Sequence, residues 1–132
     1  MPLSNSSLAH EYAAPYFIGR TVETLYVICL NNAGMPIECC YISEGTINAT
    51  QVDMRKIVEA VVRNNAVAAI LCHNHPDGLA RPSPEDIAVT KKAGEILESI
   101  GVVLLDHLIL VDGDFVSFHD TIDMEDLRHN NQ

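Results

Sequence analysis

The stretch HNHPDGLARPSPED, residues 73–86, is more informative about fold and chemistry than any other part of the chain. It follows the apolar run AVAAILC, residues 66–72, whose Val, Ile and small residues predict a short strand buried on both faces. Residues 73–83 contain two prolines and a glycine and therefore predict a loop. Ser83 is a typical helix N-cap, and Pro84 suits the first helical position. The stretch is therefore expected to connect a buried strand to a capped helix.

Three side chains of this stretch can face a single metal ion. His73 and His75 are separated by one residue at the expected end of the strand. In an extended chain, positions i and i+2 project to the same side, about 6.6 Å apart. Asp86 falls in the first turn of the next helix, whose N-terminus would point back at the same loop. Two His nitrogens and one carboxylate oxygen suit Zn²⁺ and leave a fourth position for water, which zinc converts into a nucleophile at neutral pH.

Around this stretch, the chain predicts alternating helices and strands. After an N-terminal helix over 3–18, β-branched and apolar residues predict strands over 21–30 and 36–44, joined by a turn. A helix should begin after the N-cap Asp53, with its apolar face formed by Met54, Ile57, Val58, Val61 and Val62. The helix after Ser83 should bury Ile87, Ala93, Ile96, Leu97 and Ile100, and the segments 102–112 and 115–119 should form a hairpin. This order predicts a mixed sheet flanked by helices, in the α/β or α+β class.

Length, charge and cysteine content limit the class of protein. The 132 residues are expected to form one domain. A formal net charge of −10 argues against nucleic-acid binding, which needs a basic face, and against attachment to an anionic membrane. No apolar run is long enough to span a bilayer, and residues 1–10 lack the features of a signal peptide. We therefore expect a cytoplasmic protein whose four cysteines are reduced thiols.

Several blocks, in the right order, resemble the RadC-like branch of the JAB/MPN family. The spacing His-x-His, seven residues, Ser, two residues, Asp is the core of the JAMM motif of that family, and it occurs here from His73 to Asp86. The resemblance extends over about residues 25–119. Its further blocks are ISEGTINAT (42–50) with the following helix that carries Arg55, PSPEDI (82–87), LLDHLIL (104–110) and DGDFVSF (112–118).

The resemblance implies the cytidine-deaminase-like fold of JAB domains, one zinc ion per chain, and hydrolysis of a peptide or isopeptide bond. Carried over by position, His73, His75 and Asp86 would bind the metal. Ser83 would hydrogen-bond the zinc-bound water or stabilise the oxyanion. The resemblance also divides the chain into an N-terminal helical extension (1–20), a JAB/MPN domain (21–119) and an acidic tail (120–132). RadC-like proteins usually carry a helix-hairpin-helix segment before the JAB domain. The present sequence does not contain that segment, which weakens a DNA-repair interpretation.

The general base of the JAMM reaction is less well defined by the sequence. The family has a Glu on an early strand, and a count back from Gly45 in the matching block places Cys40 there. Glu38 lies two residues earlier on the same strand face, and a bulge could bring it into register. Alternatively, a Cys40 thiolate could occupy the fourth zinc position and close the site. His107 is expected to support the site, with Asp106 fixing its tautomer, rather than to bind the metal.

Three functions remain open on this basis. The first is a JAMM-type zinc hydrolase that acts on a peptide or protein substrate. The second is a catalytically silent, zinc-binding JAB domain that serves as a scaffold or interaction module. The third, a factor associated with nucleic acid, follows from the family resemblance alone and is disfavoured by the charge.

Overall fold

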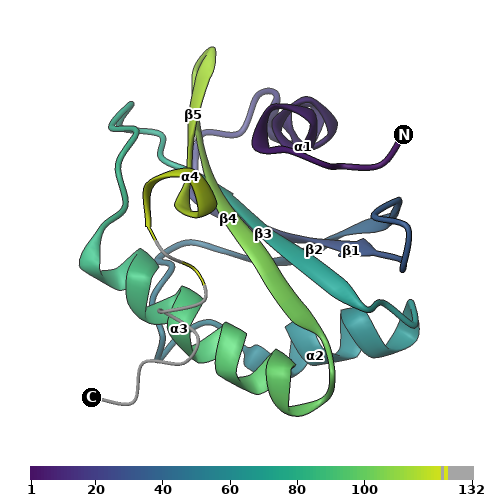
Figure 1. Ribbon diagram of the computed structural model, residues 1–132. Coiled ribbons are helices and arrows are strands. Elements are labelled where there is room, and N and C mark those ends of the chain that lie inside the picture. The colour runs from purple at the N-terminus through teal and green to yellow at the C-terminus, as the bar shows by residue number, and fades with distance from the viewer. Residues whose placement is uncertain (123, 125–132) are drawn as a thin grey trace.

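A five-stranded mixed sheet forms the centre of the computed structural model, which describes residues 1–122 and 124 (Figure 1). The strand order is β2-β1-β3-β4-β5, in which β3 and β4 are parallel and the other neighbours are antiparallel. The predicted mixed α/β architecture is therefore confirmed. The strands are β1 (Thr24–Leu30), β2 (Pro36–Glu44), β3 (Ala68–Asn74), β4 (Val103–Val111) and β5 (Asp114–Ser117).

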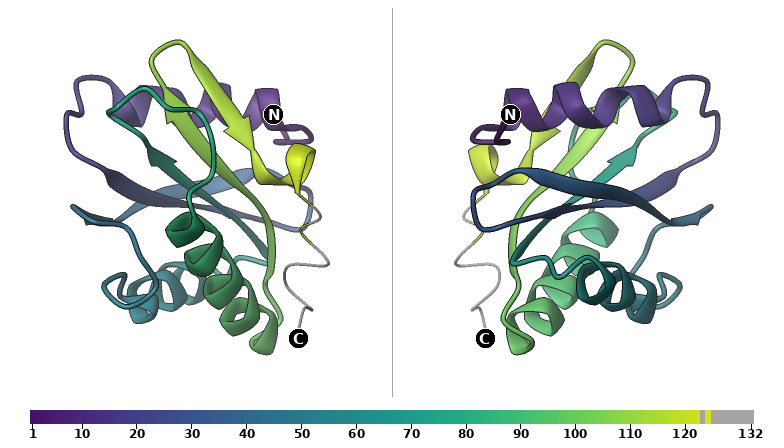
Figure 2. Two further views of the ribbon diagram at one scale, coloured as in Figure 1. Left: turned by 90° about the vertical axis from the view of Figure 1, so that its left-hand side faces the viewer. Right: turned by 90° about the vertical axis from the view of Figure 1, so that its right-hand side faces the viewer.

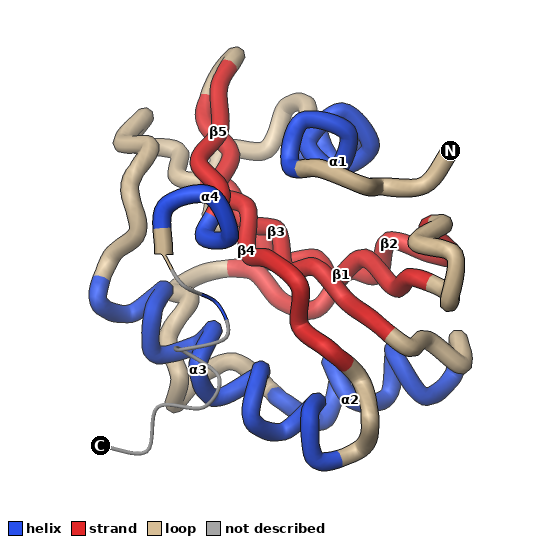
Figure 3. The backbone as a smooth tube through the Cα atoms, in the orientation of Figure 1, coloured by secondary structure: helices blue, strands red, loops and turns tan. Residues whose placement is uncertain are grey.

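Helices cover both faces of the sheet (Figures 2 and 3). Helix α1 (Ser6–Ala13) and the 3-10 helix η1 (Ala14–Phe17) lie on one face, whereas α2 (Met54–Arg63) and α3 (Pro84–Ser99) lie on the other. The short α4 (Phe118–Thr121) follows β5 directly. Side chains of the central strands alternate between two apolar clusters: Ile28 and Ile70 face α1, and Leu25 and Leu71 belong to the cluster on the α2–α3 side.

Strand β3 continues two residues further than the sequence predicts. His73 and Asn74 belong to the strand and not to the loop, because neighbours on both sides extend the ladder. His73 pairs with Leu25 of β1 and with Ile109 of β4. The carboxyl end of β3 is therefore held between two strands, and the first His of the motif is completely buried.

Helices α2 and α3 begin where the sequence predicts, but the residues that they bury differ in part from the predicted apolar faces. Asp53 caps α2, and Ser83 caps α3. Ile87 of α3 and its C-cap Ile100 are exposed, and the buried stripe contains Asp86, Val89, Thr90, Ala93, Gly94 and Leu97. The helix rests on β4 through the face that contains Asp86, so one helical turn further Thr90 points inward as well. In α2, Ala60 is buried in place of Val62.

The four cysteines are free thiols, three of them buried. Within the described residues, no helix is long and apolar enough to cross a membrane. The acidic tail predicted over 120–132 falls mainly outside the described residues.

Adjacent valines of α2 test the corrected helix face. Val61 is 1% exposed and Val62 is 64% exposed. Val61→Ala should lower the free energy of unfolding by about 2 kcal/mol, because it removes buried methyl groups and leaves a cavity. The identical change at Val62 should shift it by less than about 0.5 kcal/mol. Urea denaturation of both variants measures the difference, and equal losses would contradict this orientation of α2.

Candidate metal centre

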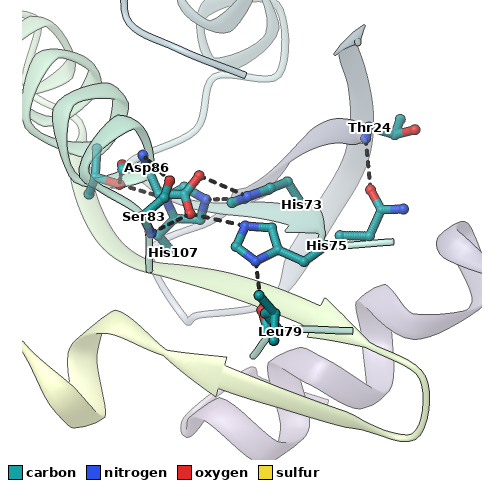
Figure 4. Close-up of polar contacts among 9 residues, drawn as sticks. Thr24, His73, His75, Leu79, Ser83, Asp86 and His107 are labelled. Carbon is teal, nitrogen blue, oxygen red and sulfur yellow. Dashed lines mark hydrogen bonds and ion pairs between the residues drawn. The ribbon is translucent and has the colours of Figure 1, made fainter. Parts of the chain in front are cut away.

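His73, His75 and Asp86 converge where β3 ends and α3 begins (Figure 4). The Nε2 atom of His73 lies 3.0 Å from Oδ1 of Asp86, and Nε2 of His75 lies 3.0 Å from Oδ2 of the same carboxylate. One potential ligand atom from each residue lies within 4.8 Å of the other two. Two ligands of a tetrahedral ion, each about 2.0 Å from it, are separated by about 3.3 Å, so this spacing is compatible with a shared ion.

Asn74, between the two histidines, anchors the end of β3. Its Oδ1 accepts a hydrogen bond from the Thr24 backbone N–H (2.7 Å), and its Nδ2 donates to the Val22 carbonyl (3.1 Å). These bonds attach the strand end to the start of β1, while the flanking His73 turns toward α3. The middle residue of the HNH tripeptide therefore has a positioning role that sequence reasoning missed.

Asp86 is at once a helix cap and a candidate ligand. Its N–H donates to Ser83 Oγ (3.0 Å), and its Oδ2 accepts the Ser83 N–H (2.8 Å), which completes a capping box. Burial favours the neutral acid, but the contacts with His73 and Ser83 outweigh it and hold the pKa of Asp86 below its ordinary value. The side chain is therefore an anion at neutral pH, as a metal ligand must be.

The ring of His75 is oriented by the loop that follows it. Its Nδ1 lies 2.7 Å from the Leu79 carbonyl oxygen, which can only accept a hydrogen bond. Nδ1 therefore carries a proton, and Nε2, which contacts Asp86 Oδ2 at 3.0 Å, is the ring nitrogen available to a metal. A backbone carbonyl behind a ligating histidine is a common arrangement in metal sites.

The buried Nε2 of His73 provides the test of whether a metal fits. Among the described residues, it is the buried side-chain polar atom that lacks a hydrogen-bond partner, because Asp86 Oδ1 is near but not placed for an N–H···O bond. A buried polar atom without a partner is costly, and a cation at the convergence point would satisfy it. Two imidazole nitrogens and one carboxylate are a typical donor set for a divalent transition metal. The residues present thus fit a metal ion.

Two cavities meet at His75. One, of about 430 Å³, is lined by His75, Ser83, Arg81 and the prolines on either side of Ser83, together with Asp77 and Leu79. The other, of about 620 Å³, lies between the η1 end of the N-terminal segment and the β4–β5 turn, and also contacts Asn74. The exposed edge of the candidate centre therefore opens into space that a ligand could enter.

The sequence matches the profile described as the RadC-like JAB domain over residues 3–124. A UPF0758 protein of Tolumonas auensis is 39% identical over 116 residues, which are 88% of this chain and 52% of that protein. A second UPF0758 protein, from Symbiobacterium thermophilum, is 36% identical over 118 residues, 89% of this chain and 50% of that protein. The chain belongs to the RadC-like JAB domain family. It spans about half the length of the curated relatives it matches.

In this RadC-like domain, Ser83 lies beside the candidate metal centre, whereas Glu38 lies far from it. Glu38 pairs with Cys29, which in turn pairs with Ala69, four residues before His73. That offset is about 13 Å along the strands. The Glu38 carboxylate instead accepts hydrogen bonds from Asn64 (2.8 Å) and Arg63 (3.4 Å) at the end of α2. No bulge of β2 shifts it into register with His73.

Cys40 is likewise not brought to the candidate ligands. It pairs with Val27, which is opposite Leu71, and β1 separates it from β3. Its Sγ is contacted by Arg63 (3.4 Å), and burial raises the pKa of the thiol, which disfavours a thiolate.

His107 lies directly behind the candidate ligands. Its Nε2 is 2.7 Å from Nδ1 of His73, on the side of that ring away from Asp86, so it supports a ligand from behind. Its other nitrogen contacts Thr90 (2.5 Å) and not Asp106, which is occupied by the backbone N–H groups of His107 and His119 and by the Ser117 hydroxyl. Sequence reasoning missed Thr90, although its spacing of four residues from Asp86 places both on one helix face.

Removal of a ligand should abolish metal binding. Asp86→Asn replaces the only carboxylate of the group and should lower the metal content from about one ion per chain to background, as should His73→Ala. Glu85→Gln is the matched control, because it removes the adjacent, exposed acid in the same helical turn. Elemental analysis and Co²⁺ titration of the apo-protein measure the effect. Full metal content in Asp86→Asn would contradict the assignment.

Proposed function

We propose that this domain is a zinc-dependent hydrolase that cleaves peptide or isopeptide bonds. The observation that carries the proposal is the asymmetry of the ligand group. His73 is fully buried beneath it, whereas His75 has 10% of its side chain exposed and lines both cavities. Three protein ligands would leave one position of a tetrahedral ion free for water or substrate, and catalytic zinc sites have such a position. Bound zinc would supply a water of lowered pKa and a Lewis acid for the substrate carbonyl.

Ser83 is suited to donate a hydrogen bond at this position. Its Oγ already accepts the Asp86 N–H, which fixes the side chain at the helix N-terminus. The hydroxyl also lies close enough to the Asp86 carboxylate to help lower its pKa, and the residue lines the 430 Å³ cavity. A donor held in place beside the metal would stabilise negative charge that develops on the substrate oxygen.

The proposed partner is a peptide or protein. The net charge of −10 supports this over nucleic acid. Arg81 lines the same cavity as Ser83 and is available to a substrate carboxylate, whereas Arg55 pairs with Asp53 (3.7 Å). The four free thiols support a cytoplasmic location.

A second candidate function is a zinc-binding module without hydrolytic activity. The placement of Glu38 and Cys40 favours it, because neither can serve as a proton shuttle beside the metal from its position. The residue of β2 level with His73 is Ser43, because both pair with Leu25, and its neighbour Ile42 is buried in the apolar cluster; neither is a carboxylic acid. A JAB domain of this kind would act as a scaffold or an interaction surface.

Hydrolysis of fluorogenic peptide and isopeptide substrates distinguishes the two functions. The zinc-loaded protein should cleave at least one of them, and the chelated protein and Asp86→Asn should not. If one zinc is bound per chain and cleavage never exceeds that of Asp86→Asn, the non-catalytic function replaces the hydrolase.

The role of Ser83 has its own control. Ser83→Asn retains a side-chain oxygen that can cap α3 but lacks the hydroxyl, and it should lower kcat about 100- to 1,000-fold. Ser83→Thr retains both features and should remain active. Equal activity in Ser83→Asn and the wild type would show that the residue is only a helix cap.

A further inference from the structure

Three fully buried polar side chains form a line beneath the candidate ligands. Thr90 belongs to α3, His107 to β4 and His73 to β3, and each has 0% relative exposure. Thr90 Oγ1 lies 2.5 Å from Nδ1 of His107, and Nε2 of His107 lies 2.7 Å from Nδ1 of His73 (Figure 4 shows the two rings). Buried polar groups in such a line restrict one another, because each proton can occupy only one contact.

Thr90 sets the direction of the hydrogen bonds. Its hydroxyl has one proton and donates it to the backbone carbonyl of Asp86 at 2.7 Å, and a carbonyl oxygen can only accept. Toward His107, the Thr90 oxygen must then accept. Nδ1 of His107 therefore carries a proton and donates it to Thr90.

The proton on Nδ1 determines what His107 offers to His73. His107 is completely buried, and its ring nitrogens face Thr90 and His73 and not a carboxylate, so a second proton would leave a buried charge without a counter-ion. The ring therefore carries one proton, and its Nε2 is an acceptor. Nδ1 of His73 must donate to it, and Nε2 of His73 is left with a lone pair. That lone pair is the atom without a hydrogen-bond partner described above.

We propose that Thr90 and His107 are positioning residues that hold His73 in the Nδ1–H tautomer and thereby present its Nε2 lone pair to the metal. The inference rests on the metal binding contained in the proposed function and does not depend on catalysis. The reverse direction of the same line would place a proton on Nε2 of His73, where it would block ligation.

Two further contacts strengthen this assignment. The line begins and ends on one residue, because the Asp86 carbonyl accepts from Thr90 and the Asp86 carboxylate faces His73. The His73 ring and helix α3 are therefore fixed relative to each other. The ring of Phe118 stacks on His107 at 4.7 Å between centroids, with 20° between the planes, which fixes the His107 ring against rotation out of the line.

Nitrogen-15 NMR of the metal-free wild type tests the inference directly. The shifts and long-range couplings of the imidazole nitrogens should show His73 and His107 both as Nδ1–H tautomers. A His73 ring protonated only at Nε2 would overturn the inference, and this measurement needs no variant that might fail to fold.

Thr90→Val tests the consequence for metal binding. Valine has nearly the same shape but lacks the hydroxyl, so Nδ1–H of His107 loses its acceptor and the line can reverse. We expect His73 to shift toward the Nε2–H tautomer and zinc affinity, measured by competition with a chromogenic chelator, to fall about 10- to 100-fold. Thr90→Ser retains the hydroxyl and is the control, with affinity within a few-fold of the wild type.

The outcomes separate this inference from the proposed activity. Thr90→Val with wild-type zinc affinity and an unchanged His73 tautomer would overturn the inference even if the protein hydrolyses peptides. Equal loss of affinity in Thr90→Ser and Thr90→Val would also overturn it, because packing and not the hydroxyl would then be responsible. Tautomer and affinity are both read without substrate, so failure of the hydrolase proposal does not affect the result.

Discussion

The Asp86 carboxylate is the interaction on which the candidate centre depends. It caps the helix that carries it, and its two oxygens each face one of the histidines. A buried anion is costly unless it is hydrogen-bonded or paired with a cation. The Ser83 N–H satisfies part of this requirement, and a metal ion would satisfy the rest. Helix start and metal group are therefore one structure, and neither can move without the other.

The parallel pair β3–β4 places the other components around Asp86. Helix α3 is the crossover connection between these two parallel strands. Its N-terminus therefore lies near the carboxyl end of β3. Crevices outside the carboxyl ends of strands are where open α/β sheets bind ligands. The same pairing places His107 of β4 two residues away from direct register with His73, and therefore on the same face of the sheet. Support for the ligand thus comes from the neighbouring strand and from the helix between the two strands.

Strand register explains why the two residues considered for the general-base position, Glu38 and Cys40, do not reach the candidate ligands. A count of residues back from Gly45 puts Cys40 at the expected general-base position and Glu38 two residues from it. Such a count does not show how the strand pairs with its neighbours. In the structure, β1 lies between β2 and β3, and its pairing offsets Glu38 toward the α2 end of the sheet. The contacts of Glu38 with Arg63 and Asn64 then hold it there.

The sequence by itself determined the features that depend on local spacing. These are the cap of α3 at Ser83, the alternation that turns His73 and His75 to the same side, and the presence of Asp86 in the first turn of the helix. Only the tertiary structure decided which remote groups approach them. Thr90 and Ile87 lie in the same helix, but the way this helix packs against β4 buries Thr90 and leaves Ile87 exposed. Hydrogen-bond direction and strand register arise from contacts between segments, and a linear pattern does not contain them.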